Sequence, residues 1–238
     1  SGKSLPCIAT ATADIAESLS RLRAEIQLIA DNNWINAARL RARDTTINIS
    51  SERQKLEENL VYPKEHAPIS LFWLLRSLDG ARPSGSIVVT DIVGTASDPS
   101  TVMSLEGSSA YFASNSGVDG FAMGAALGTQ WAAPDNPVVC ITSDQSFLQA
   151  SQALWTAAHY VLNTKFVVVN NGGSDSLTLH LGNCDHQFPL DCPEIEFTQI
   201  SKAMKIPALK AETMGELEVA LGAMFDSPGP FLIDARIH

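Results

Sequence analysis

Apolar and polar positions form two kinds of segment along most of the chain. Short, nearly continuous apolar runs are typical of strands buried on both faces, and they occur at residues 87–90, 137–143, 165–171 and 231–237. Apolar positions three and four residues apart are typical of one face of a helix. They occur at residues 68–78, where Pro68 suits a first turn, and at residues 117–130, 147–161, 195–204 and 215–225. This alternation predicts an α/β fold, a parallel sheet with helices on both faces.

The N-terminal part has a different pattern. Apolar side chains recur at helical spacing between residues 12 and 40, which predicts a helix. Residues 43–64 are polar and charged without periodicity, as expected of a connecting segment. We therefore divide the chain into an N-terminal helical segment (1–42), a linker (43–66) and one α/β domain (67–238).

Composition narrows the classes of function. The chain has 238 residues, 45% of them hydrophobic and 18% charged, as in an ordinary folded protein. Its formal charge of −10 disfavours nucleic acid and anionic membranes as partners. No apolar stretch approaches the length of a membrane span, and four scattered cysteines do not form a disulfide framework. These features predict a cytoplasmic protein in a reducing setting.

Two polar side chains stand at the ends of consecutive predicted strands. Asp144 directly follows the 137–143 run, and Asn171 closes the 165–171 run, with the 147–161 helix between them. A strand–helix–strand unit places such ends side by side, where open α/β sheets bind ligands. Carboxylate and amide oxygens suit Mg²⁺ on a phosphate, so the spacing predicts a metal–phosphate site. The alternative is that Asp144 caps the helix and Asn171 forms a turn.

The motifs around this pair resemble those of the thiamine diphosphate enzymes. Ser143-Asp144-Gln145 followed by Asn170-Asn171 is similar to that family's Gly-Asp-Gly…Asn-Asn signature. Residues 111–112, 117–128 and 131–134 also look like the family, and 153–158 resembles the benzoylformate decarboxylases. The similarity runs from about Pro68 to the C-terminus and covers the family's C-terminal, diphosphate-binding domain.

The resemblance implies thiamine diphosphate and Mg²⁺ as cofactors. It implies three metal ligands: the Asp144 carboxylate, the Asn171 side-chain oxygen and the Gly173 backbone carbonyl. It also implies an apolar residue that holds the cofactor bent. Counting back from Asp144 without gaps reaches Asp119, which is charged, whereas the Gly-Val-Asp-Gly form resembles the menaquinone-pathway enzyme, in which the residue before the aspartate has this role; we therefore expect Val118. The full set of expected cofactor-binding residues is Gly94, Thr95, Gly117, Val118, Asp119, Gly120, Ser143, Asp144, Gln145, Ser146, Asn171, Gly173 and Ser174.

Several positions depart from the family pattern or carry candidate chemistry. Ser143 replaces the usual glycine and is expected either to offer a hydroxyl to the phosphate or to crowd the site. Ser174 stands where related decarboxylases often have tyrosine. His180 falls near the expected substrate and is the candidate proton carrier, the alternative being a solvated loop histidine. A zinc site built from His180, Cys184, His186 and Cys192 is disfavoured, because their spacing matches no compact structural site.

By the same resemblance the chain is part of a lyase that decarboxylates a 2-oxo acid similar to benzoylformate, with carboligation as a further reaction. Ala67, beside His66, stands where benzoylformate enzymes have a substrate-contacting histidine, which counts against benzoylformate itself. One alternative is a carboligase like acetolactate synthase or the menaquinone-pathway synthase. The other is a non-catalytic domain that serves assembly or regulation.

The resemblance also implies partners. The family's activating glutamate comes from the N-terminal, pyrimidine-binding domain of a neighbouring subunit, and nothing in this sequence matches that domain. We therefore expect this chain to require that domain or a second chain, and to form a homo-oligomer, a dimer or a tetramer. Residues 1–42 are then interpreted as the tail of a preceding middle domain, the alternative being a helix packed on the sheet.

Overall fold

The computed structural model describes residues 12–58, 61–92, 99–105, 110–114, 118–173 and 195–237. The chain divides into two compact units, Ser1–Val61 and Tyr62–His238. The boundary between them falls inside the segment that the sequence predicts as a linker. Among the described residues, no helix combines the length and apolar character needed to cross a membrane.

The first unit contains two helices, α1 (Ile15–Ile29) and α2 (Asn32–Glu58). Asp14 caps α1 by accepting a hydrogen bond from the backbone N–H of Glu17 at 2.9 Å, and none of the residues of α1 is buried. The expectations of one helix over 12–40 and of an irregular segment from residue 43 are both wrong. The helix is interrupted at residues 30–31, and a second helix then runs to residue 58. This second stretch has no one-sided apolar pattern, but its arginine, alanine, glutamate and lysine residues have high helix propensity.

The second unit is built on a six-stranded sheet in which every pair of neighbouring strands is parallel. The strand order is β2-β1-β3-β4-β6-β5. The strands are β1 (Ile87–Thr90), β2 (Tyr111–Ala113), β3 (Val138–Ser143), β4 (Thr164–Asn170), β5 (Ala208–Ala211) and β6 (Phe231–Arg236). The four predicted strands are confirmed to within one residue at either end. The sequence analysis missed β2 and β5, since edge strands are short and partly exposed and so lack a continuous apolar run.

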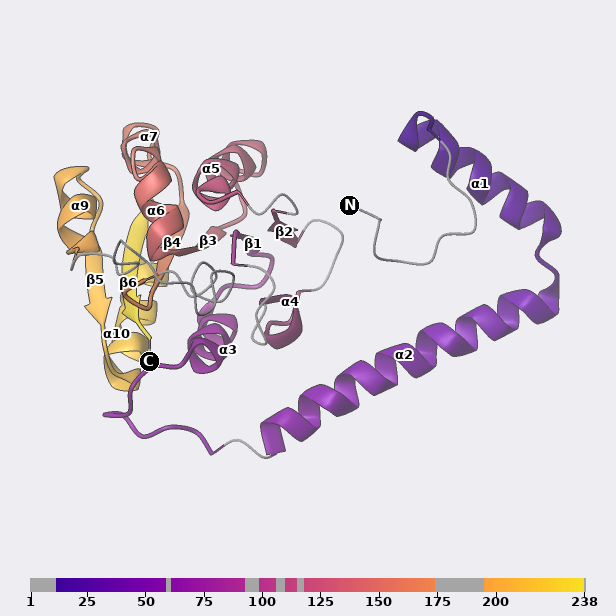
Figure 1. The fold of residues 1–238 in the computed structure, drawn as a ribbon, viewed down its shortest axis with the longest axis horizontal. Coiled ribbons are helices and arrows are strands. Elements are labelled where there is room, and N and C mark those ends of the chain that lie inside the picture. Colours follow the sequence, from indigo (N-terminus) through magenta and orange to yellow (C-terminus); the bar gives the residue numbers. More distant parts are fainter. Residues whose placement is uncertain are drawn as a thin grey trace, which may run out of the picture. The chain divides into compact units, whose positions relative to one another are not determined.

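Helices cover both faces of the sheet, which confirms the predicted fold class. One face packs on α3 (Leu71–Ala81), α4 (Pro99–Val102) and α10 (Met214–Asp226). The other packs on α5 (Phe121–Ala132), α6 (Asp144–Ala150), α7 (Ala153–His159) and α9 (Phe197–Ala203). In Figure 1, α5, α7 and α9 lie above the sheet, and α3 and α10 lie below it. Successive strand residues alternate between the two cores, so the central strands are buried on both sides.

Three predicted helices differ from the observed ones at their boundaries. Helix α3 does not open at Pro68: Ser70 caps it by accepting from the Trp73 N–H at 3.4 Å, while Pro68 bridges to Thr213. The helix expected over 117–130 begins only at Phe121, after a glycine with a left-handed backbone. The helix expected over 147–161 is two short helices, α6 and α7, separated by a turn at residues 151–152.

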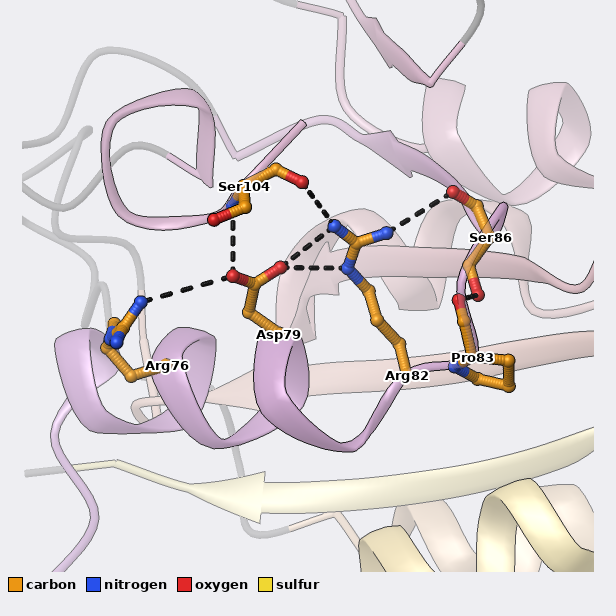
Figure 2. A network of polar contacts seen from close by, with 6 residues as sticks. All are labelled: Arg76, Asp79, Arg82, Pro83, Ser86 and Ser104. Carbon is orange, nitrogen blue, oxygen red and sulfur yellow. Dashed lines mark hydrogen bonds and ion pairs between the residues drawn. The ribbon is translucent and has the colours of Figure 1, made fainter. Parts of the chain in front are cut away.

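A polar network ties the end of α3 to two neighbouring segments (Figure 2). The Asp79 carboxylate accepts from Arg82 Nε at 2.9 Å and from the backbone N–H of Ser104, which follows α4, also at 2.9 Å. Arg82 in turn donates to the backbone carbonyls of Ser104 and Ser86, the latter just before β1. The Asp79 and Arg82 side chains are about 8% and 10% exposed, so this charge-assisted network holds the entry to β1 in place.

Lys165 is a buried cation at the start of β4, the end opposite to Asn170. Its Nζ donates hydrogen bonds to the backbone carbonyls of Ser227 and Gly229, both at 2.7 Å. These bonds connect the turn that leads into β6 to the interior of the sheet. Burial lowers the pKa of Lys165 from 10.5 to about 8, because the charged form loses hydration.

Replacing Lys165 by methionine should change the pH dependence of stability. Between about pH 8 and 10.5 the unfolded lysine keeps its proton whereas the folded one releases it. The unfolded state then binds more protons, and the free energy of unfolding rises with pH. Relative to Lys165→Met, the wild-type protein should gain about 1–3 kcal/mol across that window, as measured by urea unfolding at several pH values.

Lys202→Met, at an exposed position on α9, is the matched control and should leave the slope of stability against pH unchanged. A difference between wild type and Lys165→Met that stays flat from pH 8 upward would contradict the assignment.

Candidate functional site

The carboxyl ends of β3 and β4 meet through one hydrogen bond. Asp144 directly follows β3 and is 1% exposed. Gly172 follows β4, and its backbone N–H donates to Asp144 Oδ2 at 3.1 Å. Because Asn171 and Gly173 flank Gly172, the three residues predicted as metal ligands lie at one edge of the sheet.

Helix α6 begins at this edge, and Ser143 is its cap. Ser143 Oγ accepts a hydrogen bond from the Ser146 backbone N–H at 3.1 Å, while Asp144 is the first helical residue and accepts from the Gln145 N–H at 2.7 Å. The alternative that Asp144 caps the helix is therefore wrong, because the cap is Ser143. The Ser143 hydroxyl, which replaces the family's glycine, supports the first turn of α6.

The segment after β4 is a tight turn. Gly172 has a backbone φ of +74°, a region that glycine enters without steric cost. Asn171 is exposed, and its side-chain oxygen accepts from the Gly173 N–H at 3.3 Å. The turn interpretation of Asn171 is thus compatible with its place beside Asp144, because an amide oxygen has two lone pairs.

The donor types at this edge suit a hard divalent cation. No group of three or more His, Cys, Asp and Glu side chains among the described residues could hold a metal ion. The donors here are instead one carboxylate, one amide oxygen and one backbone carbonyl. Mg²⁺ prefers oxygen ligands, takes few of them from the protein and completes its shell with water and phosphate, so the residues present fit that ion.

A second segment lies against α6, just before α5. Ser146 Oγ donates to Asp119 Oδ1, and Gln149 Nε2 donates to Asp119 Oδ2, each at 3.3 Å. Asp119 therefore links the 118–120 segment to α6, the helix that begins at the edge where the predicted metal ligands lie. Val118 is 60% exposed, so an apolar side chain is presented on the surface of this region.

Three polar residues at the same edge went unassigned in the sequence analysis. Asp91 follows β1, and its Oδ2 accepts from the Ala122 N–H and Thr142 Oγ1, both at 3.3 Å. Asn170 and Asp234 are buried on adjacent strands and joined by a hydrogen bond of 2.9 Å. Burial raises the pKa of both aspartates. The available signal was a charged residue at or inside the end of an apolar run, as for Asp144.

Some predicted site residues lie outside the described part of the chain, and their roles stay predictions. They are Gly94, Thr95, Gly117, Ser174 and His180; Cys184, His186 and Cys192, of the disfavoured zinc site, also lie outside the described residues.

Comparison with known proteins shows what this chain is similar to. The sequence profile described as "Thiamine pyrophosphate enzyme, C-terminal TPP binding domain" matches residues 94–235. Benzoylformate decarboxylase of Pseudomonas aeruginosa is 30% identical over 173 residues, which cover 72% of this chain and 33% of that protein. A Mycobacterium tuberculosis protein provisionally named acetolactate synthase large subunit is 37% identical over 131 residues, 51% of this chain and 25% of that protein.

Solved structures agree with these matches. The thiamine diphosphate-dependent 4-hydroxybenzoylformate decarboxylase of Rhodococcus jostii RHA1 superimposes with a TM-score of 0.68 and 25% identity, over 76% of this chain and 34% of that one. The chain thus spans about a quarter to a third of the length of these relatives. The resemblance predicted from the sequence motifs is confirmed.

Gly120→Ala should destabilise the protein. Gly120 has a φ of +83°, and an added Cβ would lie 3.2 Å from Ala150 Cβ and 3.4 Å from the Ser146 carbonyl oxygen. Backbone strain and this crowding should together cost about 1–3 kcal/mol of unfolding free energy, measured by chemical denaturation.

Gly124→Ala is the matched control within α5, where an added Cβ has nothing within 4 Å. It should stabilise the helix by about 0.5–1 kcal/mol. Equal effects of the two substitutions would show that the backbone at Gly120 is not constrained by α6.

Proposed function

This chain belongs to the thiamine pyrophosphate enzymes, whose C-terminal cofactor-binding domain it carries, and we propose that it binds the cofactor's diphosphate through Mg²⁺ held by Asp144, Asn171 and the Gly173 carbonyl. The observation that carries this proposal is the hydrogen bond of 3.1 Å from the Gly172 N–H to Asp144 Oδ2. It brings a buried carboxylate beside the turn that contains the other two donors.

Electrostatics supports a metal ion at this edge. Asp91 follows β1, Asp119 precedes α5 and Asp144 follows β3, and each accepts a hydrogen bond from a neighbouring segment. A diphosphate placed beside such carboxylates would be repelled, and burying its charge without compensation is prohibitive. A divalent cation held by Asp144 would offset the charges of both the carboxylate and the diphosphate.

The reaction that we propose is the decarboxylation of a 2-oxo acid. When bound, thiamine diphosphate supplies the electron sink for breaking the bond between the carbonyl carbon and the carboxylate. The chain's own part is to anchor the phosphates at Asp144 and to support the ring end of the cofactor at Val118, the exposed apolar side chain beside Gly120. His180 is the proposed proton carrier at the substrate.

The proposed substrate is an aromatic 2-oxo acid similar to benzoylformate. The relatives named benzoylformate decarboxylase and 4-hydroxybenzoylformate decarboxylase support this class. Carboligation is the second candidate, favoured by the relative provisionally named acetolactate synthase. A carboligase gives a condensation product when a second carbonyl compound is added, whereas a simple decarboxylase gives mainly the aldehyde.

The proposed active form includes further parts. A domain that supplies the activating glutamate, from a second chain or another part of a longer protein, would complete the site, within a dimer or tetramer. A non-catalytic role in assembly is the remaining alternative. The specific observation in its favour is that the Ser143 hydroxyl already caps α6, where the family has glycine.

Asp144→Ala should abolish Mg²⁺-dependent binding of thiamine diphosphate. The carboxylate is the only charged group among the three proposed ligands, so its loss should weaken binding at least about 100-fold. Native mass spectrometry of the chain, with Mg²⁺ and thiamine diphosphate added, measures the cofactor-bound fraction. Circular dichroism checks that the variant is folded.

Asp135→Ala, at an exposed turn, is the matched control and should bind like wild type. Cofactor binding that survives in Asp144→Ala would refute the metal assignment. A folded wild-type chain that retains no cofactor at any Mg²⁺ concentration, even with the complementing domain present, would refute the binding function itself.

Val118→Ala should lower turnover more than cofactor affinity. The proposed role of Val118 is to hold the cofactor bent, so a smaller side chain should reduce kcat about tenfold while the cofactor Kd changes less than threefold, a difference of about 1 kcal/mol. Steady-state kinetics of the assembled enzyme with a 2-oxo acid, together with cofactor titration, measures both. Val219→Ala, on the exposed side of α10, should change neither, and the opposite ranking for Val118 would exclude its role.

A further inference from the structure

Two buried polar residues on neighbouring strands lead directly to the proposed metal-binding turn. Asn170 closes β4 and is 3% exposed, and Asp234 lies in β6 and is 1% exposed. Asp234 pairs in register with Val168, so Asp234 and Asn170 occupy diagonal positions on one face of the sheet. Polar groups in such an interior are costly unless they are hydrogen-bonded, which raises the question of what this pair accomplishes.

The hydrogen bond between them sets the orientation of the Asn170 amide. Asn170 Nδ2 donates to Asp234 Oδ1 at 2.9 Å. A carboxylate accepts and cannot donate, so it selects the amide orientation that turns the NH₂ group toward Asp234. The side-chain oxygen of Asn170, Oδ1, then points away from Asp234 and accepts a hydrogen bond from the Gly172 N–H at 3.2 Å.

The Gly172 N–H is therefore shared by two acceptors, one at the end of β4 and one just after β3. Asn170 Oδ1 at 3.2 Å and Asp144 Oδ2 at 3.1 Å both receive it. Gly172 has a left-handed φ of +74°, and Asp234 of β6 is linked to this amide through Asn170. The Gly172 N–H belongs to the peptide group that joins Gly172 to Asn171, so these two acceptors restrict the turn in which Asn171 and Gly173 lie.

We propose that Asp234 and Asn170 are positioning residues that hold the Gly172 amide, and through it the 171–173 turn, in the geometry that receives the metal ion. The pair does not touch the ion; it acts by restricting the turn before the ion arrives. The role as metal-site support rests on the proposed function, whereas the link from Asp234 to the Gly172 amide exists without any cofactor.

The test changes the donors and acceptors of the hydrogen bonds that link Asp234, Asn170 and Gly172. Asp234→Ala removes the carboxylate that orients the amide, and Asn170→Asp places two carboxylates against each other. The double variant Asn170→Asp with Asp234→Asn exchanges the two residue types and restores both hydrogen bonds. The asparagine at position 234 donates to the aspartate at position 170, which still accepts the Gly172 N–H. Thr164→Val, at the buried opposite end of β4, is the matched control for a change in a buried polar group.

Two readouts are measured on the 238-residue chain. The first is the hydrogen-exchange rate of the Gly172 amide by NMR, without cofactor. The second is the affinity for thiamine diphosphate in the presence of Mg²⁺, by isothermal titration. Asp234→Ala and Asn170→Asp should raise the exchange rate at least tenfold and weaken binding by about 10–100-fold, the range typical of residues that support metal ligands. The double variant should return both toward wild type, and Thr164→Val should leave both unchanged.

An unchanged Gly172 exchange rate in Asp234→Ala overturns the inference, as does a double variant no better than Asn170→Asp. If Asn170→Asp does not fold, Asp234→Ala and the double variant still decide. If the wild-type chain binds no thiamine diphosphate even with the complementing domain present, the proposed function fails and with it the role in metal binding. The exchange rates would then still establish or refute the positioning of Gly172 by Asp234.

Discussion

Parallel pairing of β3 with β4 is the constraint on which the candidate site depends. The register places Ser143 opposite Val169, so Asp144, which follows β3, lies next to Asn170, which ends β4. A shift of one residue would turn every side chain of the strand to the other face and break the two cores at once. The register of the central strands therefore also determines that a carboxylate and an Asn-Asn-Gly-Gly turn meet at one edge.

The two ends of the sheet differ in charge. At the amino end of β4 the buried Lys165 is satisfied by two backbone carbonyls, which closes a turn. Toward the carboxyl end, Asp91 follows β1, Asp144 follows β3 and Asp234 lies in β6, and burial raises the pKa of Asp91 and Asp234. Several carboxylates close together are unfavourable in their charged form unless hydrogen-bond donors or a cation offset the negative charge. The backbone N–H groups of Ala122 and Gly172 are two such donors.

The family membership and this geometry support each other without being the same argument. The sequence profile identifies the cofactor-binding domain over residues 94–235, but a profile does not say how a departure such as Ser143 is accommodated. The structure does: the serine side chain caps α6 and leaves Asp144 at the first helical position. The chain covers about a third of the length of these relatives.

The sequence by itself determined the central strands, the fold class and the placement of Asp144 and Asn171 at one edge of the sheet. Buried parallel strands are continuous apolar runs, and polar residues mark their ends. It did not reveal β2 and β5, which are short and partly exposed, nor the helical state of residues 43–58, which depends on local propensity without one-sided packing. Only the tertiary structure decided that Asp234 faces Asn170 across 64 positions of sequence, and that Gly172 shares its N–H between Asn170 and Asp144. Strand order and register create such contacts, and no local pattern in the sequence encodes them.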